Sequence, residues 1–212
     1  MRFENFLKLI SKIENIPLPA ETSHLKMLPP FRKALIKAQE KANTKAKQAA
    51  VLALFYPDKN QDTKLILILR KTYKGVHSAQ VAFPGGKPEE QDATLQDTAL
   101  RETFEEVGVP VKSVKIIRKI SQVYIPPSHF YVAPFIGVTQ ETPNFIKQDD
   151  EVEKLIEVDL EHFLDDKSLV LQDVKTSYGV EVEVPAFKLN GCIVWGATAM
   201  MLSEIKDLLK QL

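Results

Sequence analysis

The sequence predicts an α/β protein, a sandwich in which helices cover both faces of a mixed β-sheet (an α/β/α sandwich). Apolar runs of strand length fill much of the middle of the chain, whereas helical patterns stand before, between and after them. Residues 49–56, AAVLALFY, are almost continuously apolar, as expected of a strand that is covered on both faces. A chain of 212 residues can bury one sizeable core, so we expect a single domain over residues 1–212.

The first 45 residues predict a mostly helical extension of this domain. Residues 3–14 place apolar side chains at helical spacing, which predicts an amphipathic helix docked on its own domain rather than on a membrane. Four prolines between residues 17 and 30 then indicate an irregular linker. Residues 32–47, rich in Lys and Ala, predict a short helix and a solvated approach to the first strand. Whether the extension covers an active site or forms an interface, such as that of a homodimer, is left open.

Two further apolar segments follow the first strand. Residues 64–69, KLILIL, predict a strand that pairs with residues 49–56 in a hairpin. Residues 80–83 predict a short strand, which runs directly into the turn Pro84-Gly85-Gly86. The sequence therefore places a glycine-rich turn at the end of a buried strand.

A helix is expected after this turn and a polar loop. It begins near Asp92 or Thr94, since either residue can act as an N-cap, and Thr94 with Asp97 fits a capping box. Gly108, followed by Pro110, marks its end.

The second half of the chain predicts more strands and two helices. The strands cover residues 114–123, 130–138 and 156–158, and a hairpin joins residues 169–170 to 180–184 around Ser177-Tyr178-Gly179. The helices cover residues 160–164 and 197–209.

Three carboxylates gather on one face of the central helix. Glu102, Glu105 and Glu106 stand at i, i+3 and i+4, so they are neighbours on the helix surface. Like charges at this spacing repel one another by a few tenths of a kcal/mol per pair. A hard divalent cation with oxygen ligands would offset that repulsion. The alternative reading is an ordinary solvated acidic face.

The segment from Gly85 to Val109, GGKPEEQDATLQDTALRETFEEVGV, resembles the Nudix box, whose usual form is G-x5-E-x7-R-E-U-x-E-E-x-G-U with U aliphatic. Residues Arg101, Glu102, Glu105, Glu106, Gly108 and Val109 match this form. Three features depart from it: the loop from Gly86 to Arg101 is one position longer, Asp92 stands for the first acid, and Thr103 stands at an aliphatic position. The resemblance implies the Nudix fold, which is also an α/β/α sandwich.

The lengthened loop resembles the coenzyme A pyrophosphatase branch of that family. Upstream of the box, Arg70 and the string HSAQVAFPGG at 77–86 are similar to the branch pattern, with Gly75, Ala79 and Ala82 as departures. Downstream, WGATA at 195–199 resembles its W-G-x-T-A segment. The resemblance extends from about residue 49 to about residue 202.

What the resemblance implies is metal-assisted hydrolysis of a diphosphate. Mg²⁺ or Mn²⁺ would be held by Glu102, Glu105 and Glu106, with a carbonyl of the glycine turn, assigned to Gly86, as a further ligand. Gly85 and Gly86 would let the backbone approach metal or phosphate. Arg101 would orient the glutamates, paired with Asp92, rather than bind substrate.

Further site residues are expected outside the box. Glu151, in an acidic run before a strand, is the candidate general base, although a solvated loop explains the run equally well. Arg70, Lys71 and Lys74 are candidates for contact with phosphate oxygens, with surface charge as the alternative. His77 fits the branch pattern, although a structural hydrogen bond is its commoner role. Trp195 is interpreted as a packing anchor rather than an adenine platform.

Three functions follow as hypotheses. The first is hydrolysis of coenzyme A or its derivatives to 3′,5′-ADP and a 4′-phosphopantetheine product. The second is hydrolysis of another nucleoside diphosphate derivative, such as ADP-ribose, a dinucleotide or a nucleoside triphosphate. The third is a Nudix-fold binding module without turnover, which retention of all three glutamates disfavours. A requirement for the 3′-phosphate separates the first from the second.

Composition narrows the partners and the compartment. The 28 basic and 28 acidic residues cancel, which argues against nucleic acid as a partner and leaves a small-molecule nucleotide. No apolar run approaches a membrane span, and the N-terminus lacks a signal-peptide pattern. The single cysteine excludes an internal disulfide and suits a reducing compartment. We therefore expect a cytoplasmic protein that contacts no membrane.

Overall fold

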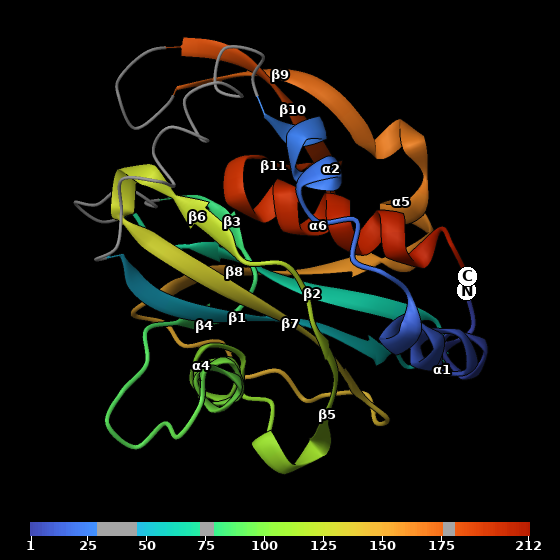
Figure 1. Cartoon of the computed structure of the whole chain (residues 1–212). Coiled ribbons are helices and arrows are strands. Elements are labelled where there is room, and N and C mark those ends of the chain that lie inside the picture. The colour runs from blue at the N-terminus through green and yellow to red at the C-terminus, as the bar shows by residue number, and fades with distance from the viewer. Residues whose placement is uncertain (29–45, 73–78, 176–180) are drawn as a thin grey trace.

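The computed structural model describes residues 1–28, 46–72, 79–175 and 181–212. Its centre is an eight-stranded mixed sheet with the order β3-β2-β1-β7-β5, to which β8 adds on β2, β4 on β1 and β6 on β7 (Figure 1). Strands β1 and β7 run parallel, and the other pairs are antiparallel, which confirms the predicted mixed sheet. The strands are β1 (Lys47–Pro57), β2 (Thr63–Arg70), β3 (Val81–Ala82), β4 (Gly85–Gly86), β5 (Val114–Lys119), β6 (Val123–Ile125), β7 (Phe130–Thr139) and β8 (Val152–Asp159).

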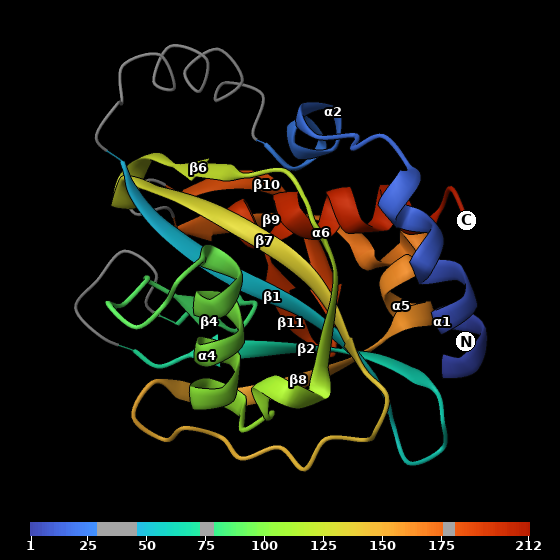
Figure 2. The same ribbon diagram turned by 60° about the horizontal axis from the view of Figure 1, so that its bottom comes forward.

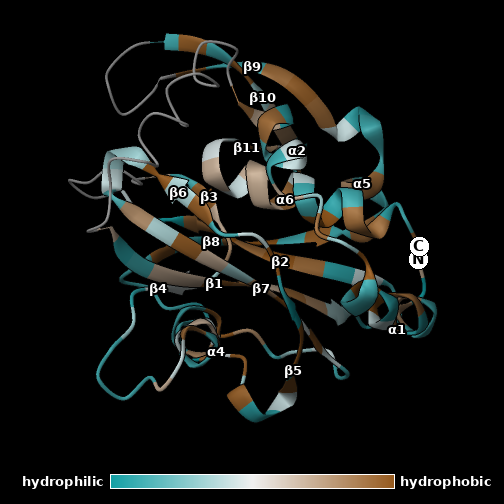
Figure 3. Cartoon of the chain, in the orientation of Figure 1, coloured by the Kyte–Doolittle hydropathy of each residue, from teal (hydrophilic) through white to brown (hydrophobic). Residues whose placement is uncertain are grey.

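Helices cover the two faces of this sheet. Helix α4 (Leu95–Val107) lies against one face, and α6 (Gly196–Leu209) lies on the other, as the two views show (Figures 1 and 2). Alternate residues of β1 enter two separate hydrophobic clusters: Phe55 packs on the α6 side, and Leu54 packs on the α4 side. The expectation that residues 49–56 form a strand buried on both faces is thus confirmed. Figure 3 shows the contrast between hydrophobic β2 and the hydrophilic loop that leads to α4.

The N-terminal residues dock on the α6 side of the sheet. Helix α1 (Phe3–Ile10) continues into the 3-10 turn η1 (Ser11–Asn15), and their apolar face is buried, with the Phe6 ring 4.9 Å from that of Phe55. The predicted docking of an amphipathic helix on its own domain is confirmed. Residues 29–45, which hold most of the second predicted helix, lie outside the described residues.

Two short helices then fasten the extension to α6. Helix α2 (Glu21–His24) and turn η2 (Leu25–Met27) contact it, and buried His24 Nε2 lies 2.9 Å from a carboxylate oxygen of Glu204. Among the described residues, no helix combines the length and apolar character needed to cross a membrane.

One predicted strand is wrong in its extent. Residues 114–123 form two strands, β5 and β6, which pair with different parts of β7. The break lies opposite Pro134, which has no N–H to donate to a ladder, although its carbonyl accepts a hydrogen bond from the Ile120 N–H.

A second sheet was not distinguished in the sequence. Strands β9 (Leu169–Lys175), β10 (Glu181–Leu189) and β11 (Cys192–Val194) form an antiparallel sheet of their own. The predicted hairpin corresponds to β9 and β10, and its turn, residues 176–180, lies outside the described residues. Among the described residues, the other short elements are α5 (Leu160–Leu164), η3 (Val111–Ser113), η4 (Pro126–Ser128) and η5 (Asp166–Ser168).

Truncation of the Phe6 side chain tests the docking of α1. Phe6→Ala removes a side chain that is 1% exposed and packs against the Phe55 ring, so we expect the free energy of unfolding to fall by about 3–5 kcal/mol. Asn5→Ala, at an exposed position of the same helix, is the control and should cost less than about 1 kcal/mol. Chemical denaturation monitored by circular dichroism measures both values. Equal losses would mean that α1 does not share the core.

Candidate active site

The site begins at the glycine turn, where the backbone passes between a strand and a helix. Gly85 and Gly86 form β4 and pair with Val51 and Ala50 of β1. Gly85 has φ +152°, and a Cβ atom there would overlap the Ala50 carbonyl oxygen. A Cβ atom on Gly86 would overlap the carboxylate of Glu102. Gly85 therefore has no space for a side chain, whereas a side chain on Gly86 would displace the Glu102 carboxylate from the turn. Both positions agree with the close backbone approach expected from the sequence.

Helix α4, which carries the acids, begins and ends as predicted. Thr94 and Asp97 make a reciprocal capping box, with the Thr94 N–H 2.9 Å from the Asp97 carboxylate. Gly108 ends the helix in the left-handed conformation. Thr103, at the position where an aliphatic residue was expected, is buried and donates to the Ala99 carbonyl at 2.7 Å. That bond satisfies its hydroxyl inside the core.

Glu106 and Glu102 both approach the glycine turn. Glu106 is almost fully buried, with 3% of its side chain exposed, and accepts a hydrogen bond from the Gly85 N–H at 2.8 Å. Arg70 Nη1 lies 3.2 Å from its other oxygen. Burial raises the pKa of Glu106 to about 7, and the negative charges of Glu102 and Glu151 act in the same direction. Burial also raises the pKa of Glu102, whose side chain is 15% exposed.

Glu105 faces a different partner. Half of its side chain is exposed, and its carboxylate accepts a hydrogen bond from Arg101 Nη1 at 2.8 Å. The predicted shared face is therefore divided: two acids reach the turn, and the third is engaged by an arginine. Within the described ranges, no group of three or more His, Cys, Asp or Glu side chains is arranged so that it could hold a metal ion.

Arg101 organises the loop and the helix together. It forms a double hydrogen bond with Asp92, from Nε at 3.0 Å and from Nη2 at 2.9 Å, and Nη2 also donates to the Lys87 carbonyl. A further contact of 3.2 Å reaches Glu102. The predicted pairing of Arg101 with Asp92 is confirmed. The guanidinium holds the pKa of Asp92 at about 2, well below its ordinary value.

The donor set fits a hard divalent cation. Glu102 and Glu106 supply carboxylate oxygens beside the same turn, and Gly86 has the bare backbone that a close metal or phosphate approach requires. Their raised pKa values show that the positive charges nearby do not fully compensate the burial of these carboxylates. A cation between loop and helix would supply the missing compensation.

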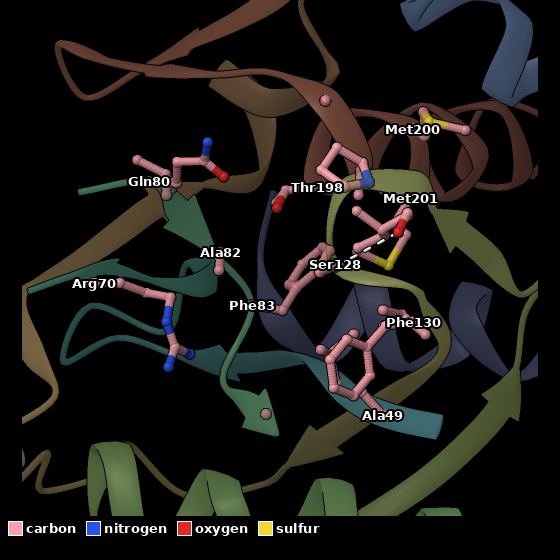
Figure 4. Close-up of a pocket in the computed structure, with 18 of the residues that line it drawn as sticks. Ala49, Arg70, Gln80, Ala82, Phe83, Ser128, Phe130, Thr198, Met200 and Met201 are labelled. Carbon is pink, nitrogen blue, oxygen red and sulfur yellow. Dashed lines mark hydrogen bonds between the residues drawn. The ribbon is translucent and has the colours of Figure 1, made fainter. Parts of the chain in front are cut away.

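A cavity of about 890 Å³ opens beside the turn (Figure 4). Gly85 and Gly86 lie in its wall together with three of the predicted residues, Arg70, Lys71 and Glu151. The Lys71 N–H donates to the Glu151 carbonyl at 2.8 Å, so the two predicted segments meet here. Lys74 and His77 lie outside the described residues.

Much of the remaining wall is apolar and was missed in the sequence. It contains residues of η2, of the segment around η4 and of α6: Met27, Leu28, Tyr124, Ile125, Phe130, Met200 and Met201. Apolar residues in a cavity have the same sequence pattern as apolar residues in a core, so no signal distinguished them. Trp195, interpreted as a packing anchor, is half-buried and lines this cavity. Thr198 lies in the same wall, and WGATA was the only hint of it in the sequence.

Comparisons with known proteins agree with this geometry. Residues 46–176 match the NUDIX domain family. The uncharacterized Nudix hydrolase NudL of Yersinia enterocolitica is 32% identical over 141 residues, which cover 66% of this chain and 71% of NudL, and NudL of Yersinia pestis is 31% identical over the same length. A Nudix hydrolase from Mycobacterium smegmatis, RenU, superimposes with a TM-score of 0.54 at 15% identity, covering 79% of this chain and 88% of RenU. That likeness concerns the fold.

Asp92→Asn tests the role of the buried ion pair. The folded pKa of Asp92 lies below its unfolded value, so its contribution to stability is present in full above about pH 4 and is lost as the pH falls towards 2. We expect the variant to be less stable than the native protein by about 2 kcal/mol at pH 7. The difference should shrink between pH 4 and pH 2. Thermal unfolding across this range measures it, and a difference that is independent of pH would contradict the assignment.

Proposed function

This chain belongs to the NUDIX domain family, and on that premise we propose that it hydrolyses the diphosphate bond of coenzyme A or of its derivatives, giving 3′,5′-ADP and a 4′-phosphopantetheine product. The observation that carries the proposal is the position of Glu102 and Glu106 at the Gly85–Gly86 turn, beside a large cavity. Oxygen ligands, bare backbone and space for a substrate occur together there.

Glu102 and Glu106 would hold Mg²⁺ or Mn²⁺, with the Gly86 carbonyl as another proposed ligand. Glu105 would join them only by leaving its hydrogen bond with Arg101. When bound, such a cation neutralises charge on phosphoryl oxygens and activates water. The chain's own residues have separate tasks. Arg101 positions the acidic helix through Asp92 and Glu105. Glu151 lines the cavity, and its charge raises the pKa values of Glu102 and Glu106; we assign it the role of general base.

The amphipathic wall supports a substrate of the coenzyme A class. Arg70 and Lys71 provide positive charge near the turn, where they would bind phosphate oxygens. The methionines and aromatic residues on the far wall would accommodate the less polar parts of a ligand. Two segments that resemble the coenzyme A pyrophosphatase branch, residues 79–86 and WGATA at 195–199, contribute to this cavity.

A substrate screen tests this function. With Mg²⁺ and with Mn²⁺, we would compare coenzyme A, 3′-dephospho-coenzyme A, ADP-ribose and nucleoside triphosphates, with products identified by mass spectrometry. Release of 3′,5′-ADP from coenzyme A at the highest kcat/KM is the expected result. Better cleavage of ADP-ribose would support the second hypothesis and overturn the coenzyme A assignment. No turnover of any substrate would favour a binding module.

Replacement of the acids tests the metal assignment. Glu102→Gln and Glu106→Gln keep side-chain size but remove the charge, so we expect kcat to fall by about a hundredfold or more. Glu90→Gln, at an exposed position of the loop before α4, is the matched control and should keep the native kcat. Melting temperatures of the variants establish that each is folded. Full activity of both α4 variants would remove Glu102 and Glu106 from the mechanism.

A further inference from the structure

Helix α6 begins at the wall of the cavity, and its first turn exposes backbone donors there. Trp195 is its N-cap, and no side chain among the described residues caps it. Gly196 has the left-handed backbone conformation, with φ +65°, and the residues after it are right-handed helical. When a left-handed residue is followed by right-handed ones, their consecutive backbone N–H groups point into one shared hollow that can bind an anion. The first N–H groups of a helix have no partner within it, and the helix dipole makes this end positive.

Thr198, in the same turn, adds an independent observation. It is 8% exposed and lines the cavity, and its side chain has no hydrogen-bond partner among the residues that the structure describes. Figure 4 shows it at the cavity wall, on the side away from Arg70. Among the described residues no buried side-chain nitrogen or oxygen lacks a hydrogen-bond partner, so this unpaired hydroxyl is accessible from the open space of the cavity, where it can donate to a ligand.

The space in front of this turn is open. Apart from its chain neighbours and the backbone of its own helix, a Cβ atom built on Gly196 would meet no atom of the described residues within 4 Å. Backbone N–H groups, a hydroxyl and a positive helix end together form a site for an oxyanion. This site lies on a different element from the glycine turn: α6 follows β11, which contacts β3, and the chain leaves β3 to reach Gly85. The cavity therefore has two places suited to anionic groups.

We propose that the first turn of α6, with the Thr198 hydroxyl, binds a phosphate monoester of the substrate, separate from the diphosphate at the Gly85–Gly86 turn. The inference rests on the proposed function, because coenzyme A carries both groups: a diphosphate and a 3′-phosphate. According to this proposal, the first turn of α6 recognises the 3′-phosphate of the substrate, and the acidic helix α4 does not. A ligand without this group would leave Thr198 unpaired.

The test measures binding and not turnover, so that it is independent of hydrolysis. Isothermal titration without divalent metal compares 3′,5′-ADP with 5′-AMP on the native protein and on Thr198→Val, which keeps the shape and removes the hydroxyl. We expect the native protein to bind 3′,5′-ADP at least about tenfold more tightly, and the variant to lose most of that preference. Thr198→Ser should retain it. Thr139→Val, a buried threonine at the far end of β7, is the matched control and should bind as the native protein does.

The outcomes separate this inference from the proposed function. A preference for 3′,5′-ADP that depends on Thr198 would support the site even if coenzyme A is not hydrolysed. The same preference in the native protein and in a folded Thr198→Val variant would overturn it. Equal weakening of both nucleotides by Thr198→Val would also overturn it, since the turn would then bind the 5′-phosphate. Failure of the native protein to bind 3′,5′-ADP would do the same, whatever the result of the substrate screen.

Discussion

The backbone at Gly85 and Gly86 runs in contact with β1 on one side and with α4 on the other. A side chain on Gly85 would overlap the β1 backbone, and one on Gly86 would displace the Glu102 carboxylate. This contact sets the distance between the sheet and the acidic helix. It also brings the Gly85 N–H to the Glu106 carboxylate at 2.8 Å, which fixes the most buried acid of the site. This close packing determines where the acids, the cavity wall and the loop before α4 lie.

Charge is distributed over the acidic helix in two groups. Arg101 satisfies Asp92 and Glu105, so that part of the site is neutralised by the chain itself. Glu102 and Glu106 are buried beside the turn, and their raised pKa values indicate incomplete compensation. One arginine thus separates a structural ion pair from carboxylates that remain suited to an external cation. The separation explains why acids at adjacent helix positions differ so much in environment.

The sequence predicted the parts of the fold that depend on local pattern. The strand at residues 49–56, the capping box at Thr94 and the pair of Arg101 with Asp92 all have short-range or motif-level signals. The split of residues 114–123 into two strands depends on Pro134, a residue of another strand, and local periodicity carries no such information. The orientation of Glu105 towards Arg101 and the role of the apolar wall likewise depend on tertiary packing. In the site, the motif located the acids and the turn, but the surfaces that would hold the rest of a substrate came only from the structure.

The cavity draws its two halves from different stretches of the chain. The acids, the glycine turn and Glu151 all lie within residues 46–176, the part that matches the family, whereas Met27, Leu28 and the first turns of α6 lie outside it. Substitutions in these flanking segments can therefore alter which molecule is held without disturbing how a bond is broken. Substrate selectivity in such an enzyme could therefore diverge through substitutions in the flanking segments, while the residues that perform the reaction stay the same.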